Sequence, residues 1–227
     1  MKNKLYYQFA GSCSLLLFAF LSYVMKFYPS WIQPFDTFLA EPLYQLRPTL
    51  SGFFLWITQF ANPIPLVILF LAVLVILLYG KQYTEAIWLS GGVILVAGIL
   101  NPVLKLFFLR ERPTLEHLVT EHSFSFPSGH AVASMVFYGS LILLLPIFVE
   151  NKQLRWFLQG LLGLIILSIG MSRIYLGVHY PSDILGGYAL SLSWLLLTFP
   201  LYQEQRFIWR FKNKQYCYLF IIIYSSS

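Results

Sequence analysis

The chain has few charged residues and almost no cysteine. Of its 227 residues, 15 are Lys or Arg and 9 are Asp or Glu, together 11% of the chain, whereas charged residues make up about 25% of a typical soluble domain. A chain this poor in charge and this rich in aromatic residues is not disordered. Its two cysteines, Cys13 and Cys217, are too few and too far apart for a disulfide framework or a metal-binding pattern.

Apolar residues take the place of the missing charge. Hydrophobic residues make up 58% of the chain and aromatic residues 19%, and a soluble domain of this size could not bury so much apolar surface. We therefore expect an integral membrane protein. Its net charge of +6 then indicates cations that anchor the chain at the cytoplasmic surface, and no nucleic-acid partner.

Gaps between charges mark the candidate membrane spans, since a spanning helix needs about 20 mainly apolar residues. Such gaps occupy residues 5–25, 48–80, 86–104, 122–149, 156–172 and 184–203. Pro63 and Pro65 divide the longest gap into a short apolar helix near 50–61 and a span near 64–80, and the fourth span starts near Ala131. The predicted fold class is all-α, a polytopic protein with six transmembrane helices, the first of them uncleaved.

The distribution of Lys and Arg predicts the orientation in the membrane. Placing both termini in the cytoplasm (N-in, C-in) puts nine of the 15 Lys and Arg residues on that side, in line with the positive-inside rule. The longest polar connections, residues 107–130 and 173–183, then lie outside. Residues 30–49 are expected to form an interfacial amphipathic segment, and the basic tail, residues 202–227, to lie on the cytoplasmic leaflet. We expect one domain, residues 1–227, with its polar motifs within residues 86–201.

The first polar cluster is the stretch KLFFLRERP, which ends at Pro113. Lys105 and Arg112 are seven residues apart, about two helical turns, so a helix would place both on one stripe and Arg110 on another face. Since the residue before a proline avoids the α conformation, we expect the helix to end there. Alone, the cluster is also typical of a basic cap at the membrane surface.

The second cluster is FPSGHA, directly before the fourth span. Ser128 is suited to the N-cap position, and Gly129 allows another group to approach the backbone closely. A helix start with free N–H groups attracts anions, and His130 can exchange a proton near neutral pH. Alone, this is also typical of a capped helix with an interfacial histidine.

The third cluster is SRIYLGVHYPSD. Pro181 suits the first turn of the sixth span, and Asp183, four residues after His179, can reach back to the imidazole. A carboxylate bonded to one ring nitrogen leaves the other with a free lone pair. Arg173 adds a cation. Alone, the pattern also fits a snorkelling arginine and a capping aspartate.

Together the three clusters favour phosphoryl transfer at one membrane face. Lys105, Arg112 and Arg173 would neutralise phosphate oxygens, with Ser128 and the Gly129 amide as further donors. One histidine would attack phosphorus and the other would protonate the leaving oxygen. No metal or other cofactor is needed for that chemistry.

The three motifs, KxxxxxxRP, PSGH and SRxxxxxHxxxD in this order, resemble those of the type 2 phosphatidic acid phosphatase (lipid phosphate phosphatase) superfamily. The motifs occupy residues 105–183, and the six-span layout extends the resemblance. It implies a metal-independent hydrolase with His179 as the nucleophile, His130 as the general acid and Asp183 as the partner of His179. It further implies that Lys105, Arg112, Ser128, Gly129, His130 and Arg173 bind the phosphate. Vanadium haloperoxidases share the motifs, but they are soluble.

The resemblance is greatest to compact bacterial members, phosphatidylglycerophosphatase B and undecaprenyl-pyrophosphate phosphatases among them. The implied substrate is thus a lipid phosphate or diphosphate, namely phosphatidylglycerol phosphate, undecaprenyl pyrophosphate or phosphatidic acid. We expect hydrolysis at the outer face of the cell membrane, with membrane lipids as the surroundings and no obligate protein partner. Two alternatives stay open: a lipid or anion transporter or non-catalytic scaffold, and a phosphatase of small soluble phosphates. The dipeptides Glu116-His117 and Glu121-His122 are expected to form a solvated loop rim.

Overall fold

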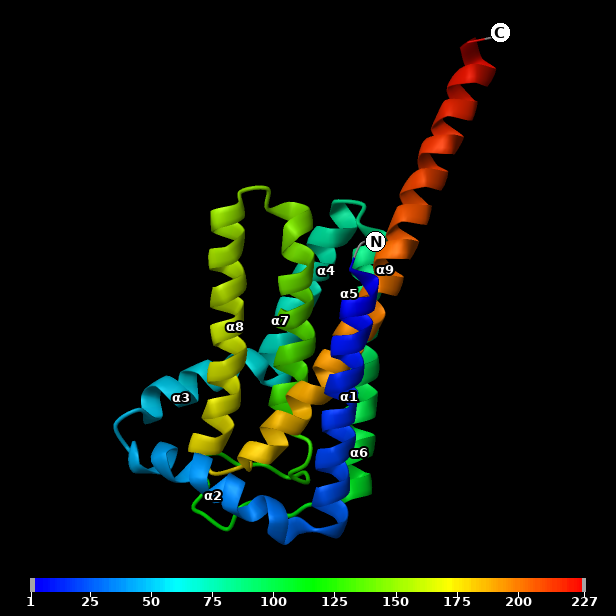
Figure 1. Ribbon diagram of the computed structural model, residues 1–227. Coiled ribbons are helices and arrows are strands. Elements are labelled where there is room, and N and C mark those ends of the chain that lie inside the picture. The colour runs from blue at the N-terminus through cyan, green and yellow to red at the C-terminus, as the bar shows by residue number, and fades with distance from the viewer. Residues whose placement is uncertain (1–2, 226–227) are drawn as a thin grey trace.

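The computed structural model describes the backbone of residues 3–225 and the side chains of residues 3–211, and every regular element in that backbone is a helix. Figure 1 shows a bundle of long, roughly aligned helices with a transverse layer at one end. The all-α fold class predicted from the sequence is confirmed.

Five helical segments are long and apolar enough to cross a membrane. They are α1 (Lys4–Phe27), the combined Tyr83–Phe108 segment, α7 (Gly129–Phe148), α8 (Lys152–Tyr175) and the first part of α9 (Pro181–Ser225), as far as Phe211. The combined segment consists of α5 (Tyr83–Gly91), the π-helical η2 (Gly92–Leu100) and α6 (Asn101–Phe108).

A bent helix pair is the candidate for the sixth span. The first arm consists of α3 (Ser51–Ile57) and η1 (Thr58–Ala61), and the second is α4 (Pro63–Tyr79), at an angle of 51°. The bend lies at Asn62, whose ψ of 146° is extended, because the residue before a proline avoids the α conformation. This agrees with the short helix and the span that Pro63 and Pro65 predicted.

The predicted interfacial segment is α2 (Pro29–Gln45), which lies across one end of the bundle next to α3 (Figure 1). It buries Asp36 and Ala40 against the bundle and exposes Trp31 and Phe38. This amphipathic helix covers the ends of α8 and α9, the two helices that carry the third polar motif.

Close contact between α7 and α9 forms the centre of the bundle. A Cβ atom on Gly187 would lie 2.9 Å from the Cβ of Ala131 and 3.1 Å from the carbonyl oxygen of Ser128, distances at which a side chain does not fit. Glycine therefore lets the start of α9 approach the start of α7. This approach places Asp183 beside Ser128, whose N–H donates to the Asp183 carbonyl oxygen at 3.2 Å.

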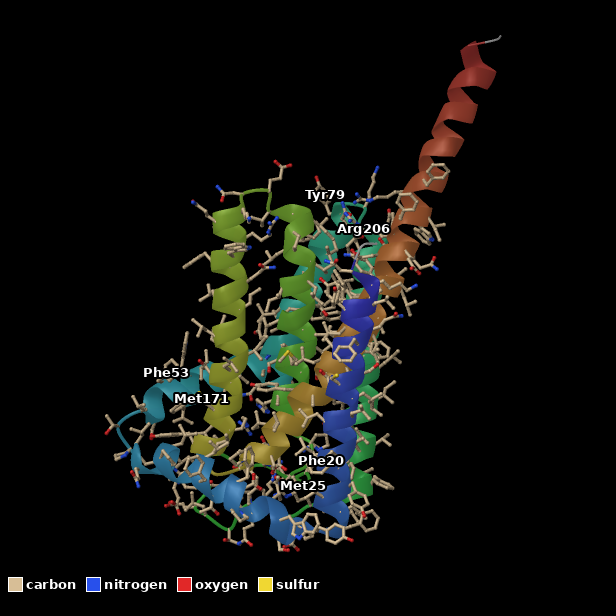
Figure 2. The ribbon with its side chains drawn as sticks, viewed as in Figure 1. Phe20, Met25, Phe53, Tyr79, Met171 and Arg206 are labelled. Atoms are coloured by element: carbon tan, nitrogen blue, oxygen red, sulfur yellow. The ribbon has the colours of Figure 1, made fainter. Side chains whose placement is uncertain are left out.

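The outer surface of the bundle is apolar. Phe20, Phe53 and Met171 project from α1, α3 and α8 (Figure 2) and are between 44% and 60% exposed. Side chains of this kind, spread over all sides of the bundle, are typical of contact with lipid tails. The chain is a multi-pass membrane protein.

The two ends of the bundle differ in character. The start of α1 and the far part of α9 lie at the end opposite α2, together with Tyr79 and Arg206 (Figures 1 and 2). The predicted N-in, C-in orientation needs the termini on one side and the motifs on the other, and the fold has that arrangement. Which end faces the cytoplasm stays a prediction.

The predicted cytoplasmic tail, residues 202–227, follows the last span without a break, since α9 continues as one helix to Ser225. The side chains beyond Phe211, including that of Cys217, lie outside the described residues, so the predicted contact with the leaflet stays a prediction. Cys13 is exposed on α1.

Candidate active site

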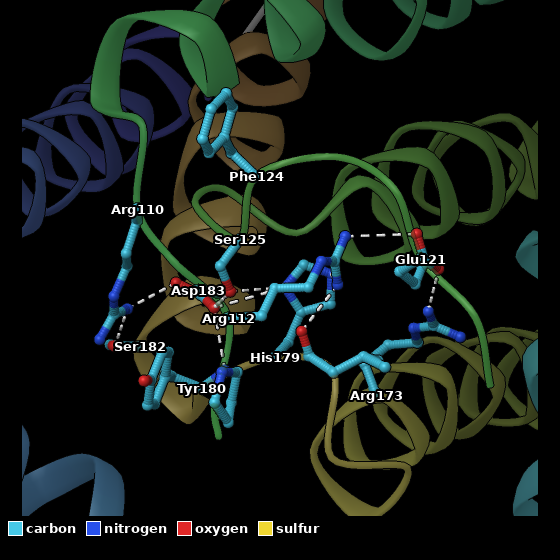
Figure 3. Close-up of polar contacts among 12 residues, drawn as sticks. Arg110, Arg112, Glu121, Phe124, Ser125, Arg173, His179, Tyr180, Ser182 and Asp183 are labelled. Carbon is cyan, nitrogen blue, oxygen red and sulfur yellow. Dashed lines mark hydrogen bonds and ion pairs between the residues drawn. The ribbon is translucent and has the colours of Figure 1, made fainter. Parts of the chain in front are cut away.

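The structure brings the three motifs together at the end of the bundle covered by α2. Lys105 comes from α6, Arg112 from the connection between α6 and α7, and Ser128, Gly129 and His130 from the start of α7. Arg173, His179 and Asp183 come from the end of α8, the turn after it and the start of α9. Figure 3 shows the central part of this cluster, with His179 at the middle. All eight residues predicted from the sequence lie at this end of the bundle.

His179 and Asp183 form the predicted pair. Nδ1 of the imidazole lies 3.3 Å from Oδ2 of Asp183, and both side chains are buried. Pro181 begins α9, so Asp183 lies in its first turn, where a carboxylate is favoured by the helix dipole.

The contacts of His179 define which ring nitrogen carries the proton. On one side, Nδ1 faces the Asp183 carboxylate, which can only accept. On the other, Nε2 lies 3.3 Å from Nη1 of Arg112, and a guanidinium can only donate. The proton therefore belongs on Nδ1, and Nε2 presents a lone pair. This is the protonation state that a histidine nucleophile needs.

Burial keeps His179 neutral. Desolvation lowers the pKa of its imidazole to about 3, against the opposing effect of Asp183 and with a further lowering by Lys105 and Arg112. At neutral pH the ring is therefore unprotonated on Nε2.

Two arginines share one carboxylate beside His179. Oε2 of Glu121 accepts a hydrogen bond from Nη2 of Arg112 at 3.2 Å, and Oε1 accepts one from Arg173. Thr58 Oγ1 further fixes the Arg173 guanidinium at 2.9 Å. Because the two guanidinium groups converge on one anionic group, the same pair can hold a phosphate oxygen.

The start of α7 adds further donors. Ser128 occupies the N-cap position as predicted, but its side chain does not cap the helix. Its buried Oγ has no hydrogen-bond partner among residues 3–211. Gly129 lies close to α6, since a Cβ there would be 3.9 Å from Cε of Lys105 and 3.3 Å from the Asn101 amide nitrogen. A buried hydroxyl without a partner and a helix start beside a lysine are suited to an anion.

His130 has a partner that the sequence did not indicate. Its Nε2 lies 2.7 Å from Oδ1 of Asn62 at the bend before α4. With the amide oxygen as the acceptor, Nε2 carries the proton and donates it to Asn62. Asn62 thus fixes the orientation of the His130 ring, and the general-acid role of His130 stays a prediction.

The expectation about the first motif was wrong in its geometry. The helix ends at Phe108 and not at Pro113, because Leu109 adopts a left-handed conformation (φ 52°) that closes α6. Arg112 therefore reaches the site from the connection, held by Val178 O and Ser123 O at 2.7 Å each, and does not share a helical stripe with Lys105. Both residues still converge on His179.

The Asp183 carboxylate accepts hydrogen bonds from other residues in addition to its contact with His179. Its Oδ2 also accepts hydrogen bonds from Ser125 Oγ and, at 2.9 Å, from the Tyr180 N–H. Its Oδ1 accepts from Nη1 of Arg110 at 2.5 Å. Sequence reasoning missed Ser125 and assigned Arg110 only to another helix face.

The two dipeptides of the connection differ from each other. His117 Nε2 contacts the Pro113 carbonyl oxygen at 2.8 Å and is exposed, as a loop rim would be. Glu121 was expected at the same rim but lies within the site. His122 lines a cavity of about 620 Å³ beside α6, together with Lys105 and Glu121.

Comparison with known proteins agrees with this geometry. The family model described as PAP2 superfamily matches residues 86–207, which is more than half of the chain and includes every motif residue. The chain belongs to the PAP2 superfamily. It is therefore a phosphatase, a hydrolase of phosphoric esters.

Individual PAP2 relatives cover most of the chain. This chain is 36% identical to phosphatidylglycerophosphatase B of Bacillus subtilis over 151 residues. The match covers 63% of this chain and 71% of the relative. Over 149 residues, 63% of this chain and 70% of the relative, the chain is 30% identical to the undecaprenyl-diphosphatase BcrC of the same organism.

A solved PAP2 structure matches the fold. The crystal structure of a transmembrane PAP2 type phosphatidylglycerolphosphate phosphatase from Bacillus subtilis superposes with a TM-score of 0.74 at 25% identity. The match covers 86% of this chain and 97% of that one.

Proposed function

We propose that this PAP2 phosphatase removes phosphate from a lipid phosphate or diphosphate at the extracytoplasmic face of the cell membrane, through a phosphohistidine on His179. The observation that carries the proposal is the lone pair on His179 Nε2, held beside Arg112 at 3.3 Å and next to the Arg112–Glu121–Arg173 cluster. Binding or transport of an anion would need the cations but not an oriented nucleophile.

The first step transfers the phosphoryl group to the enzyme. Nε2 of His179 attacks phosphorus, and the bond between phosphorus and the leaving oxygen breaks. That oxygen takes a proton from His130 in its imidazolium form, which is left as a neutral imidazole. Asp183 stabilises the positive charge that develops on His179 through its contact with Nδ1. The phosphate oxygens are held by Arg112, Arg173 and the donors at the start of α7.

The second step releases inorganic phosphate. Water gives a proton to His130 as it attacks the phosphohistidine, and the bond between phosphorus and Nε2 breaks. His179 returns to its neutral form, and His130 regains the proton that it gave to the leaving group. No residue of this cycle needs a metal, and that expectation is tested by adding a chelator.

A lipid substrate fits the position of the site. The cavity of about 620 Å³ contains Lys105 and Glu121 and is also lined by Leu106, which is 67% exposed on the apolar surface of α6. A phosphate could thus reach Lys105 while its acyl or prenyl chain stays in the bilayer. The names of the relatives, a phosphatidylglycerophosphatase and an undecaprenyl-diphosphatase, support the same substrate class.

The distribution of cations supports the proposed extracytoplasmic location. Three of the Lys and Arg residues on the side of the motifs, Lys105, Arg112 and Arg173, point into the site. Without them the predicted cytoplasmic side has nine of the other 12. Accessibility of a single cysteine at Glu116 to an impermeant thiol reagent in intact cells would test this orientation.

A substrate panel in mixed micelles tests the proposed function. Purified protein is given phosphatidylglycerol phosphate, undecaprenyl pyrophosphate, phosphatidic acid and a sugar phosphate, and inorganic phosphate is measured. We expect release from at least one lipid and little from the sugar phosphate. A preference for the sugar phosphate would favour a soluble-substrate phosphatase, and binding without release would favour a transporter or scaffold.

The nucleophile is tested by two variants and a trap. His179→Ala should abolish turnover, whereas the matched variant His117→Ala, at the exposed loop rim, should retain it. Acid-labile, base-stable radioactivity from a ³²P-labelled substrate should appear on the wild-type chain only. A His179→Ala enzyme with full phosphate release would refute the assignment.

A further inference from the structure

Arg110 lies between two buried carboxylates. Its Nη1 donates to Oδ1 of Asp183 at 2.5 Å, and its Nη2 donates to Oδ2 of Asp36 at 2.8 Å. Asp183 is 0% and Asp36 3% exposed. The ring of Tyr180 covers the guanidinium, with its centroid 4.0 Å from Cζ. The guanidinium is thus held by two carboxylates, by one aromatic face and by the Ser182 hydroxyl, to which Nη1 also donates at 2.9 Å.

Asp36 makes a second set of contacts, with the start of α9. Its Oδ1 accepts from the backbone N–H of Ser182 and its Oδ2 from the Ser182 hydroxyl, each at 2.8 Å. Since Ser182 directly precedes Asp183, the interfacial helix α2 is bonded to the first turn of the helix that carries the carboxylate. Asp36 therefore supports Asp183 by two routes, through Arg110 and through the backbone of Ser182.

We infer that Arg110 and Asp36 are positioning residues, which hold the Asp183 carboxylate in the orientation that presents Nε2 of His179 to phosphorus. This inference rests on the proposed function. Figure 3 shows Arg110 on the opposite side of Asp183 from Arg173 and Glu121. Arg110 therefore acts on the carboxylate and not on the phosphate.

The physical reason is the direction of the Asp183 carboxylate. His179 Nδ1, Ser125 and the Tyr180 N–H all approach Oδ2, whereas Arg110 approaches Oδ1. A buried carboxylate oxygen that loses its cationic donor is strongly destabilised, and the group then rotates or shifts toward other donors. Such a rotation moves Oδ2 away from the imidazole. Loss of a partner that orients a metal ligand typically lowers activity by about 10–100-fold, and we expect a loss of the same order for this carboxylate.

Chemical rescue of Arg110→Ala tests the inference. A cavity of about 790 Å³ between α2 and the segment after Arg110 is lined by Asp36, Arg110 and Tyr180, so a small cation can reach the space that the side chain leaves. We expect kcat to fall by about 10–100-fold, while KM and inhibition by orthovanadate change by less than about threefold. Millimolar guanidinium should restore kcat severalfold in the variant and have no such effect on the wild type.

A variant pair on α2 provides the matched control. Asp36→Asn should lower kcat, whereas Glu41→Gln, which removes the same charge from an exposed position of the same helix, should not. Because Asp36 acts partly through Arg110, its effect should be smaller in the Arg110→Ala background than in the wild type. Thermal unfolding in detergent is measured for each variant, and Arg110→Lys replaces Arg110→Ala if the latter does not fold.

Three results would overturn the inference. These are a wild-type kcat in both Arg110 variants, a loss of orthovanadate binding equal to the loss of kcat, and no response of Arg110→Ala to guanidinium. They differ from a failure of the proposed function, in which the wild-type enzyme itself releases no phosphate from any lipid.

Discussion

Oε2 of Glu121 lies 3.2 Å from Nη2 of Arg112, and the same carboxylate is bonded to Arg173. The Glu121 carboxylate is thus bonded to the same guanidinium groups that would bind a phosphate. If Arg112 and Arg173 bind the substrate phosphate as proposed, the phosphate has to displace Glu121 first. On that proposal, only the fraction of molecules with Glu121 displaced is competent to bind phosphate.

Replacing Glu121 should tighten anion binding. In Glu121→Gln the arginines lose their ionic partner, so we expect the inhibition constants of orthovanadate and inorganic phosphate to fall by about 3–10-fold. Steady-state inhibition in micelles measures both. Glu116→Gln, an exposed glutamate of the same connection, is the control. Unchanged or weaker inhibition in Glu121→Gln would mean that the carboxylate does not compete with phosphate.

Removing Asn62 should impair protonation of the leaving group. Asn62→Ala takes away the acceptor 2.7 Å from His130 Nε2, so the ring is no longer held as a donor. We expect kcat for a lipid alcohol leaving group to fall by on the order of 10-fold, and by about 10²–10⁴-fold in His130→Ala. p-Nitrophenyl phosphate, whose leaving group needs no proton, should be much less affected. Equal losses for both substrates would contradict this role of His130.

Asp183→Asn should cause a larger loss than either positioning variant. The amide cannot stabilise the positive charge on His179, and the comparable change in a serine protease triad costs about 10⁴-fold in kcat. We expect a fall of at least about 10³-fold at unchanged orthovanadate inhibition. Single-turnover measurement of phosphohistidine formation would show the loss in the first step. Slow release of phosphate with normal formation of the intermediate would contradict this interpretation.

Acid should destabilise the protein through His179. Its folded-state pKa of about 3 lies below the unfolded value of about 6.5, so between these values the unfolded chain binds the proton and the folded chain does not. The stability that neutral His179 contributes is thus present above about pH 6.5 and is lost as the pH falls. Between pH 7 and 5 the loss is about 2 kcal/mol.

Thermal unfolding in detergent measures this effect across the same pH range. His179→Asn has no proton to take up, so its melting temperature should depend less on pH than that of the wild type. Parallel pH dependences for the two proteins would show that other groups are responsible.

The layout of the spans could be predicted because it depends on local sequence. Charge-free runs marked the spans to within a few residues, except for the end of the last one, which was expected at 203 and extends to Phe211. Pro63 placed the bend at Asn62. The end of α6 could not be placed in this way. Pro113 was the visible stop signal, but the helix ends where Leu109 adopts a left-handed conformation, and no pattern in the sequence marks that residue.

The motif residues of the candidate site could be predicted because their spacing in the sequence is distinctive. The residues that support them could not be predicted. Asp183 comes four residues after His179, and that spacing was enough to predict the contact. Asp36 and Asn62 approach the site only because α2 and the bend before α4 pack there, and no spacing relates them to the motifs. Glu121 was recognised as part of the Glu121-His122 dipeptide, but nothing in the surrounding sequence indicated that it lies between two arginines.

The position of Asp36 on α2 affects how the protein must be handled after extraction. This helix is not among the candidate spans and contacts α8 and α9, so at its predicted interfacial position it would be exposed to the solvent that replaces the lipid headgroups. A detergent that detaches α2 would leave the transmembrane bundle intact, soluble and helical, yet without one support of the Asp183 carboxylate. Absence of turnover in one detergent is therefore no measure of correct folding, and reconstitution into lipid becomes part of the assay.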